Sequence, residues 1–190
     1  MISRIDHVSI AVKEFDRAHD FFKKIAGIVE GASAIDSQLE FKWEIYSAGD
    51  LSRLELMHPT GENSFLANFL SDKEGGVHHI TFETPDIHKT KGRLDEYQIP
   101  YFGFNDSLEN WKELFIHPRD AFGVLIQIAQ FHPNEWLHPE ENLPRGKKWS
   151  VEDDGDRILL TVAHPGGGKV KLPLDKSEVE RLIRDLQKVQ

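Results

Sequence analysis

The chain has 190 residues, of which 39% are hydrophobic and 29% charged, a composition typical of a folded globular protein. It has no cysteine, which excludes disulfides, thiolate metal sites and cysteine nucleophiles. Its net charge of −9 disfavours nucleic acid and anionic membranes as partners. Because it lacks both an apolar run of ~18 residues and a signal-peptide core at its start, we expect a cytoplasmic protein.

The first part of the chain predicts a strand, a helix and then further strands. Residues 4–12 alternate apolar and other side chains with a period of two, as a half-buried strand does. Phe15 and Phe22 follow at helical spacing. Residues 39–46 and 51–57 alternate again, so two more strands are expected there.

The second part repeats this pattern 72 residues later. Residues 77–84 alternate like the first strand, and they place His79 at the position that His7 holds in that strand. At the same offset, residues 123–129 match the strand at 51–57. The chain therefore contains an internal duplication.

The duplication predicts an α+β fold. Each half has the order βαβββ, and the two modules span about 1–72 and 73–132. One such module has too small a core to be stable alone, so we expect the two to pair into a single domain, 1–132.

The tail, residues 133–190, has a different pattern. After an irregular connector, residues 156–164 and 169–174 flank a Pro-Gly-Gly-Gly turn and predict a β-hairpin. Ser177 and Glu180 then predict a capping box at the start of a final helix. That helix carries an apolar stripe of Val179, Leu182, Ile183, Leu186 and Val189. The stripe must cover either this domain or a second subunit, and we expect a homodimer.

Four potential metal ligands share one face of the predicted sheet. Apolar neighbours at a period of two fill the core face of the strands that carry them. The residues that point to the other face are His7, Glu55, His79 and Gln127. Pairing of the modules about a pseudo-twofold axis would bring all four together. Two imidazoles, a carboxylate and an amide oxygen suit a divalent ion such as Zn, Co, Mn, Ni or Fe.

A further carboxylate is predicted near this site. In the strand at 39–46 the polar set, which includes Glu44, is expected to face the same concavity. Glu44 is therefore a candidate general base. The alternative is that Glu44 is a solvated strand residue paired with Lys42. The equivalent position in the second module is Ile116, so one wall of the cavity would be acidic and the other apolar.

Four sequence blocks resemble the vicinal oxygen chelate superfamily, and within it they are most similar to methylmalonyl-CoA epimerases. The blocks are IDHVSIAV, LELMHPTGENSFLANFL, GGVHHITFETPDI and GVLIQI. The resemblance covers about residues 1–130. It implies paired βαβββ modules that form a cupped mixed sheet around a divalent metal, and a small-molecule substrate that is an acyl-CoA or a 2-oxo compound.

The resemblance also assigns roles to residues. The epimerase metal positions fall on His7, Glu55, His79 and Gln127, and the acid that flanks the substrate falls on Glu44. Two positions depart from the epimerase pattern, which has Gln in place of Glu55 and Glu in place of Gln127. The latter Glu is one of two proton carriers in the epimerases, and an amide cannot carry a proton. In glyoxalase-type relatives a metal-bound Glu acts as base, so Glu55 could be both ligand and base.

We therefore expect a divalent-metal-dependent isomerase or lyase that moves a proton alpha to a carbonyl or acyl thioester, with Glu44 or Glu55 as base. Two alternatives remain open. An Fe(II) extradiol-type dioxygenase would use the same two histidines and carboxylate. A non-catalytic, ligand-binding module of the antibiotic-resistance type would not need the metal.

Overall fold

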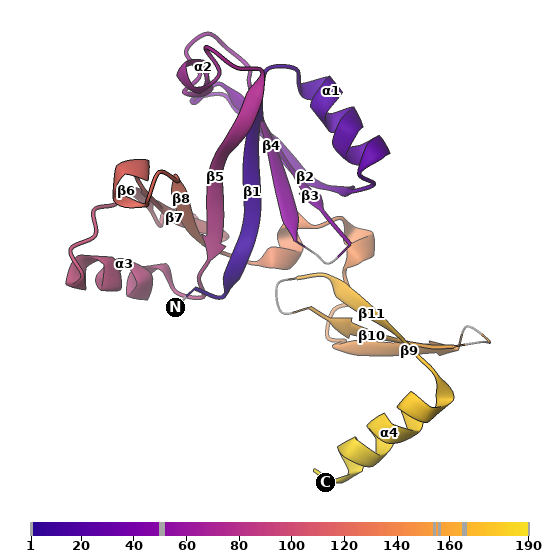
Figure 1. The fold of residues 1–190 in the computed structure, drawn as a ribbon. Helices are drawn as coiled ribbons and strands as arrows, with labels where there is room; N and C mark the ends of the chain where they lie inside the picture. Colours follow the sequence, from indigo (N-terminus) through magenta and orange to yellow (C-terminus); the bar gives the residue numbers. More distant parts are fainter. Residues whose placement is uncertain (1, 50–51, 154, 156, 165–166, 190) are drawn as a thin grey trace. The chain divides into compact units, whose positions relative to one another are not determined.

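The computed structural model describes residues 2–49, 52–153, 155, 157–164 and 167–189 (Figure 1). It consists of two compact units, residues 1–138 and residues 139–190. The predicted hairpin includes Asp156, Pro165 and Gly166, which lie outside the described residues.

The first unit is built on an eight-stranded sheet. The strands are β1 (Arg4–Val12), β2 (Val29–Asp36), β3 (Phe41–Ser47), β4 (Arg53–Pro59), β5 (Gly75–Glu83), β6 (Phe102–Asn105), β7 (Trp111–Ile116) and β8 (Ile126–Phe131). The helices are α1 (Phe15–Asp20), which continues as a π-helical turn over Phe21–Ile25, α2 (Leu66–Phe69) and α3 (Ile87–Glu96).

The strand order shows the predicted duplication. The order is β2-β3-β4-β1-β5-β8-β7-β6, with the antiparallel pair β1 and β5 side by side in the middle (Figure 1). On either side of this pair, β1 is parallel to β4 and β5 is parallel to β8. Each half has the order βαβββ, so the predicted α+β fold of two paired modules is confirmed.

The sheet is covered on both faces. On one face, Phe15 of α1 packs in a cluster with Leu56, and Ile87 of α3 packs in a matching cluster with Ile128. The third cluster lies on the other face, where Leu66 at the start of α2 packs against Ala11 and Met57. Because neighbouring residues of a strand point to opposite faces, α2 and the predicted ligands are on the same side of the sheet.

The connector after β8 belongs to the first unit. It forms a 3₁₀ turn, Pro133–Trp136, whose indole lies between Trp43 of β3 and Trp111 of β7, with ring centroids 5.6 and 5.0 Å away. Leu137 is buried, and a Cβ on Gly31 would lie only 2.6 Å from the Trp136 carbonyl oxygen. The unit extends through His138, a few residues beyond the boundary predicted at 132.

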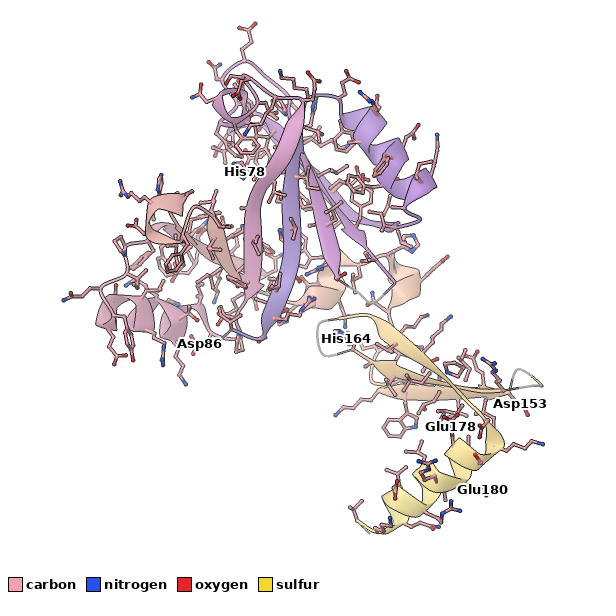
Figure 2. All side chains as sticks on the ribbon, viewed as in Figure 1. His78, Asp86, Asp153, His164, Glu178 and Glu180 are labelled. Carbon is pink, nitrogen blue, oxygen red and sulfur yellow. The ribbon has the colours of Figure 1, made fainter. Side chains whose placement is uncertain are left out.

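The second unit is a three-stranded antiparallel sheet followed by a helix. The elements are β9 (Trp149–Asp153), β10 (Ile158–Ala163), β11 (Lys169–Leu174) and α4 (Lys176–Gln187). The predicted hairpin is β10–β11, and β9 adds a third strand to it. The capping box consists of Asp175 and Glu178, not Ser177 and Glu180, because the helix begins at Lys176; Glu178 is labelled in Figure 2.

The apolar stripe of α4 lies open in the single chain, with Leu186 57% and Val189 83% exposed. Among the described residues, no helix has both the length and the apolar character that crossing a membrane requires.

The packing of the connector predicts how the chain tolerates truncation. A chain that ends at residue 138 should unfold cooperatively, whereas one that ends at residue 132 should be less stable by about 2 kcal/mol or more, because it loses the packed side chains of Trp136 and Leu137. Thermal denaturation followed by circular dichroism checks this difference. Trp136→Ala in the full chain is the matched control and should lower the melting temperature in the same direction. Equal melting temperatures for the two truncated chains would contradict the prediction.

Candidate functional site

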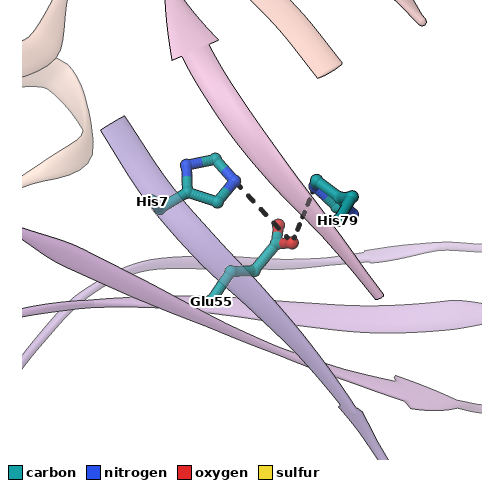
Figure 3. A group of neighbouring side chains, drawn as sticks. All are labelled: His7, Glu55 and His79. Atoms are coloured by element: carbon teal, nitrogen blue, oxygen red, sulfur yellow. Dashed lines mark ion pairs between the residues drawn. The ribbon is translucent and has the colours of Figure 1, made fainter. Parts of the chain in front are cut away.

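Three of the predicted ligands converge on adjacent strands. His7 is on β1, Glu55 on β4 and His79 on β5, and one ligand atom from each lies within 4.8 Å of the others. Oε2 of Glu55 is 3.9 Å from Nε2 of His7 and 3.6 Å from Nε2 of His79 (Figure 3). Strand register explains the convergence, because Ser9 of β1 is the cross-strand partner of both Glu55 and His79.

One nitrogen of this cluster has no partner. Nε2 of His79 is buried and, among the described residues, receives and donates no hydrogen bond. Burial holds the pKa of His79 well below its usual range, the nearby His7 and His78 act in the same direction, and the Gln127 side chain acts weakly in the opposite one. The imidazole is therefore neutral near pH 7, with a ring nitrogen directed at the Glu55 carboxylate. A buried polar atom without a partner is costly, whereas the same nitrogen is well placed to bind a cation.

The other ring nitrogen of each histidine is engaged. Nδ1 of His7 is 2.7 Å from Oδ2 of Asp6, and Nδ1 of His79 is 3.0 Å from Nδ1 of His78. When Nδ1 carries the proton and donates it to such a partner, Nε2 keeps its lone pair for a ligand. Nε2 of each ring therefore faces Glu55, and that of His7 also lies 2.9 Å from the Thr81 hydroxyl.

Asp6 is anchored in a buried ion-pair network. Its Oδ1 accepts hydrogen bonds from Arg53 and Arg4, and the Asp6 and Arg53 side chains are each only 1% exposed. Burial by itself would raise the pKa of Asp6, but the hydrogen bond to His7 and the charge of Arg53 bring the pKa below its usual value. Asp6 is thus an ionised acceptor that fixes the orientation of the His7 ring.

His78 lies beside the site, contrary to the strand alternation, which predicts that it points to the other face of β5. A shift in the β1–β5 register between Ser9 and Ile10 interrupts the alternation at this point. The His78 ring packs against the rings of Phe65 and Phe69, with centroids 5.7 and 5.0 Å away. Burial lowers its pKa to about 4, so the ring is a neutral acceptor for His79.

Glu55 is the carboxylate of the cluster. Its Oε2 accepts a hydrogen bond of 2.5 Å from the Ser9 hydroxyl. Burial raises the pKa of Glu55 above its usual value, and the charge of Glu113 acts in the same direction, while His7 and the Ser9 hydroxyl lower the pKa. A divalent cation between the carboxylate and the two imidazoles would offset this desolvation. The donor set and the unpartnered His79 nitrogen therefore fit a metal.

Gln127 lies next to the three ligands and connects them to a further carboxylate. The Thr81 hydroxyl is 2.9 Å from Nε2 of His7 and 2.5 Å from Oε1 of Gln127, to which it donates. Nε2 of Gln127 donates to Oε2 of Glu113 over 2.7 Å. The structure thus places the predicted fourth ligand beside the cluster, with its amide oxygen engaged by a hydroxyl.

Glu113 is a residue of the site that the sequence argument missed. It is half-buried on β7, and its Oε2 also accepts a hydrogen bond of 2.9 Å from the Trp111 indole. Strand alternation could have predicted its position. Leu114 and Ile116 are core residues of the same strand, so the Glu113 side chain points to the ligand face.

Glu44 is not in this site, and its predicted position is wrong. It is paired with Leu56 across β3 and β4 and therefore faces α1, together with Tyr46. Its carboxylate is 3.6 Å from Nδ1 of His19 and 3.3 Å from the Lys42 amine. The wall of β3 on the ligand side is instead apolar, because Phe41, Trp43 and Ile45 line it.

The surroundings of Glu44 form a separate polar cluster. His19, Glu30 and Glu44 also bring three potential ligand atoms within 4.8 Å of one another. However, Lys23 lies 2.9 Å from Glu30 and Lys42 lies 3.3 Å from Glu44, and the His19 nitrogens contact Tyr46 and Glu30. The two ammonium groups already balance the carboxylates, so we interpret this cluster as an ion-pair network.

Comparison with known proteins identifies close relatives. The chain is 33% identical over 134 residues to the ethylmalonyl-CoA/methylmalonyl-CoA epimerase of Cereibacter sphaeroides. This match covers 68% of this chain and 99% of that protein. It is 30% identical over 132 residues to the human mitochondrial methylmalonyl-CoA epimerase, covering 68% of this chain and 74% of that protein.

Solved structures and a family profile agree with this relationship. The crystal structure of methylmalonyl-CoA epimerase from Mycobacterium tuberculosis superposes with a TM-score of 0.63 at 26% identity, covering 70% of this chain and 90% of that chain. The profile of the glyoxalase/bleomycin resistance protein/dioxygenase superfamily matches residues 6–115. With this match and the paired βαβββ modules, the chain belongs to that superfamily, the vicinal oxygen chelate superfamily that its motifs resemble.

Proposed function

We propose that this chain is an isomerase that moves a proton alpha to the carbonyl group of an acyl-CoA thioester, with a divalent metal held by His7, Glu55 and His79. The observation that carries the proposal is the buried, unpartnered Nε2 of His79 facing a desolvated carboxylate. The relatives at 30% identity or more are epimerases of methylmalonyl-CoA or of ethylmalonyl-CoA and methylmalonyl-CoA, which supports the same class of substrate.

The ligand set that we propose has two nitrogens and one carboxylate. Asp6 and His78 hold the two rings with Nε2 toward Glu55. We propose Gln127 as a neighbour of these ligands, because its amide group bridges the Thr81 hydroxyl and the Glu113 carboxylate. A bound divalent ion would stabilise the negative charge that develops on the thioester oxygen as the α-proton leaves.

Glu55 is the carboxylate that we propose to take the proton. Its Oε2 lies 3.9 Å from Nε2 of His7 and 3.6 Å from Nε2 of His79, so the carboxylate would be next to a substrate bound at the metal. Glu44 lies on the α1 face of β3, which supports Glu55 over Glu44 as the base. The Ser9 hydroxyl holds Oε2 of Glu55 in place.

Two other functions use the same fold. Two histidines and one carboxylate also form the ligand set of an extradiol-type dioxygenase, so oxygen uptake with a catechol would favour that function over ours. A ligand-binding module has no use for the metal cluster, and a purified protein without stoichiometric metal would favour that function.

The metal site predicts a graded response to substitution. His7→Ala and His79→Ala should each lose most of the bound metal, because each removes a nitrogen ligand. Asp6→Asn should weaken metal binding about 10–100-fold, since it loosens the His7 ring. Elemental analysis after dialysis against a competing chelator measures both effects.

The control for this series is His88→Ala, which removes an exposed histidine paired with Asp106 and should retain the metal. Stoichiometric metal in His79→Ala at the affinity of the unaltered chain would contradict the proposed ligand set. His78→Ala should fall between the control and His79→Ala, because it removes only the partner of Nδ1.

If Glu55 is the base, a substitution there should affect proton transfer much more than metal binding. Glu55→Gln should keep the metal, because the amide oxygen can still bind it, but should lower proton exchange about 10²-fold or more. The assay is incorporation of solvent deuterium at the α-carbon of methylmalonyl-CoA, followed by mass spectrometry. Glu44→Gln is the matched control and should leave exchange unchanged. A loss of exchange in Glu44→Gln but not in Glu55→Gln would refute the assignment of the base.

A further inference from the structure

Inversion at the α-carbon needs more than one base. One group must remove the proton from one side of the carbon, and a second group must return a proton from the other side. Gln127, where the resemblance places the second carrier, is an amide that neither gives nor takes a proton near pH 7. The proposed function therefore leaves one proton carrier to be found in this chain.

We infer that Glu113 is this second proton carrier, a role that rests on the proposed function. Glu113 is on β7, in the opposite module from Glu55, and its side chain contacts that of Gln127 over 2.7 Å. The carboxylate that is missing at residue 127 thus lies one hydrogen bond further along the same face of the sheet. The first module has no counterpart, since the equivalent residue is Phe41.

The Glu113 carboxylate is oriented and yet available. The Gln127 amide and the Trp111 indole both donate to Oε2. Among the described residues, Oε1 accepts no hydrogen bond, and the side chain is half-buried. Oε2 is therefore the anchored oxygen, and Oε1 is the one that can receive or deliver a proton.

The carboxylate at residue 113 and the amide at residue 127 are compatible as neighbours. An amide at 127 donates to the carboxylate at 113. A carboxylate at both positions would place two negative charges in contact, and such a pair cannot be fully ionised. Gln127 therefore donates a hydrogen bond to Glu113 at the position where a second carboxylate would repel it.

The reaction balances without a further reactant. The α C–H bond breaks, its proton goes to one carboxylate, and the electron pair is delocalised onto the thioester oxygen. A new C–H bond then forms on the opposite side of the carbon with a proton from the other carboxylate. No electron is gained or lost, and the two carboxylates exchange protonation states in each turnover.

The test supplies one enantiomer of methylmalonyl-CoA at a time, in deuterium oxide, to the metal-loaded full chain. Deuterium incorporation and inversion of configuration are measured separately. In Glu113→Gln we expect inversion to fall about 10²-fold or more. Exchange should persist with the enantiomer whose α-hydrogen faces Glu55. The double variant Glu113→Gln/Gln127→Glu, which moves the carboxylate to residue 127, should recover inversion relative to Glu113→Gln.

The matched control is Glu109→Gln, which neutralises an exposed carboxylate just before β7 and should invert the substrate like the unaltered chain. Metal content checks that each variant is folded at the site. Unchanged inversion in Glu113→Gln, with exchange present in the unaltered chain, would overturn the role of Glu113 alone. No exchange and no inversion by the unaltered metal-loaded chain would overturn the proposed function and this inference with it.

Discussion

The site depends on a carboxylate that is largely removed from water and lies between two imidazoles. Among the described residues, Glu55 accepts one side-chain hydrogen bond, from the Ser9 hydroxyl, while burial favours the neutral form of the carboxyl group. The surrounding groups keep this arrangement in place: Asp6 and His78 each hold one ring through Nδ1, and Arg53 holds Asp6. A cation between the three ligands would satisfy the carboxylate and the unpartnered His79 nitrogen together, so the same residues explain both the local cost and the ability to bind metal.

The central strand pair transmits this arrangement to the whole sheet. Across β4, β1 and β5, one row of cross-strand partners contains Glu55, Ser9 and His79. The next row, across β1, β5 and β8, contains His7, Thr81 and Gln127. Partners in such a row lie about 5 Å apart, which is the spacing that a cluster of ligands needs. The duplication therefore does more than double the core, because pairing of β1 with β5 is what joins ligands from the two modules.

The two modules and the shared face of the ligands could be predicted from the sequence, because both follow from the spacing of residues along the chain. The offset of 72 residues identifies the modules, and the alternation of apolar residues tells which face His7, Glu55 and His79 share. Glu44 shows where local information ends. Both faces of β3 are covered, so its apolar residues do not reveal which face is the core, and only the pairing of Glu44 with Leu56 settles it. His78 is displaced by a shift in the β1–β5 register, and the alternation of residues along a strand does not predict such a shift.

The alternation of β3 predicts an acidic wall on the β3 side of the site and an apolar wall on the β7 side, and the structure has the reverse. The β3 wall is apolar, with Trp43 and Ile45, and the acidic side chain comes from β7. Glu55 and Glu113 therefore approach from different modules, and the charge of Glu113 helps to raise the pKa of Glu55. Ser9 holds one carboxylate and Gln127 the other, so the two are placed as the proposed two-sided proton transfer at one carbon requires.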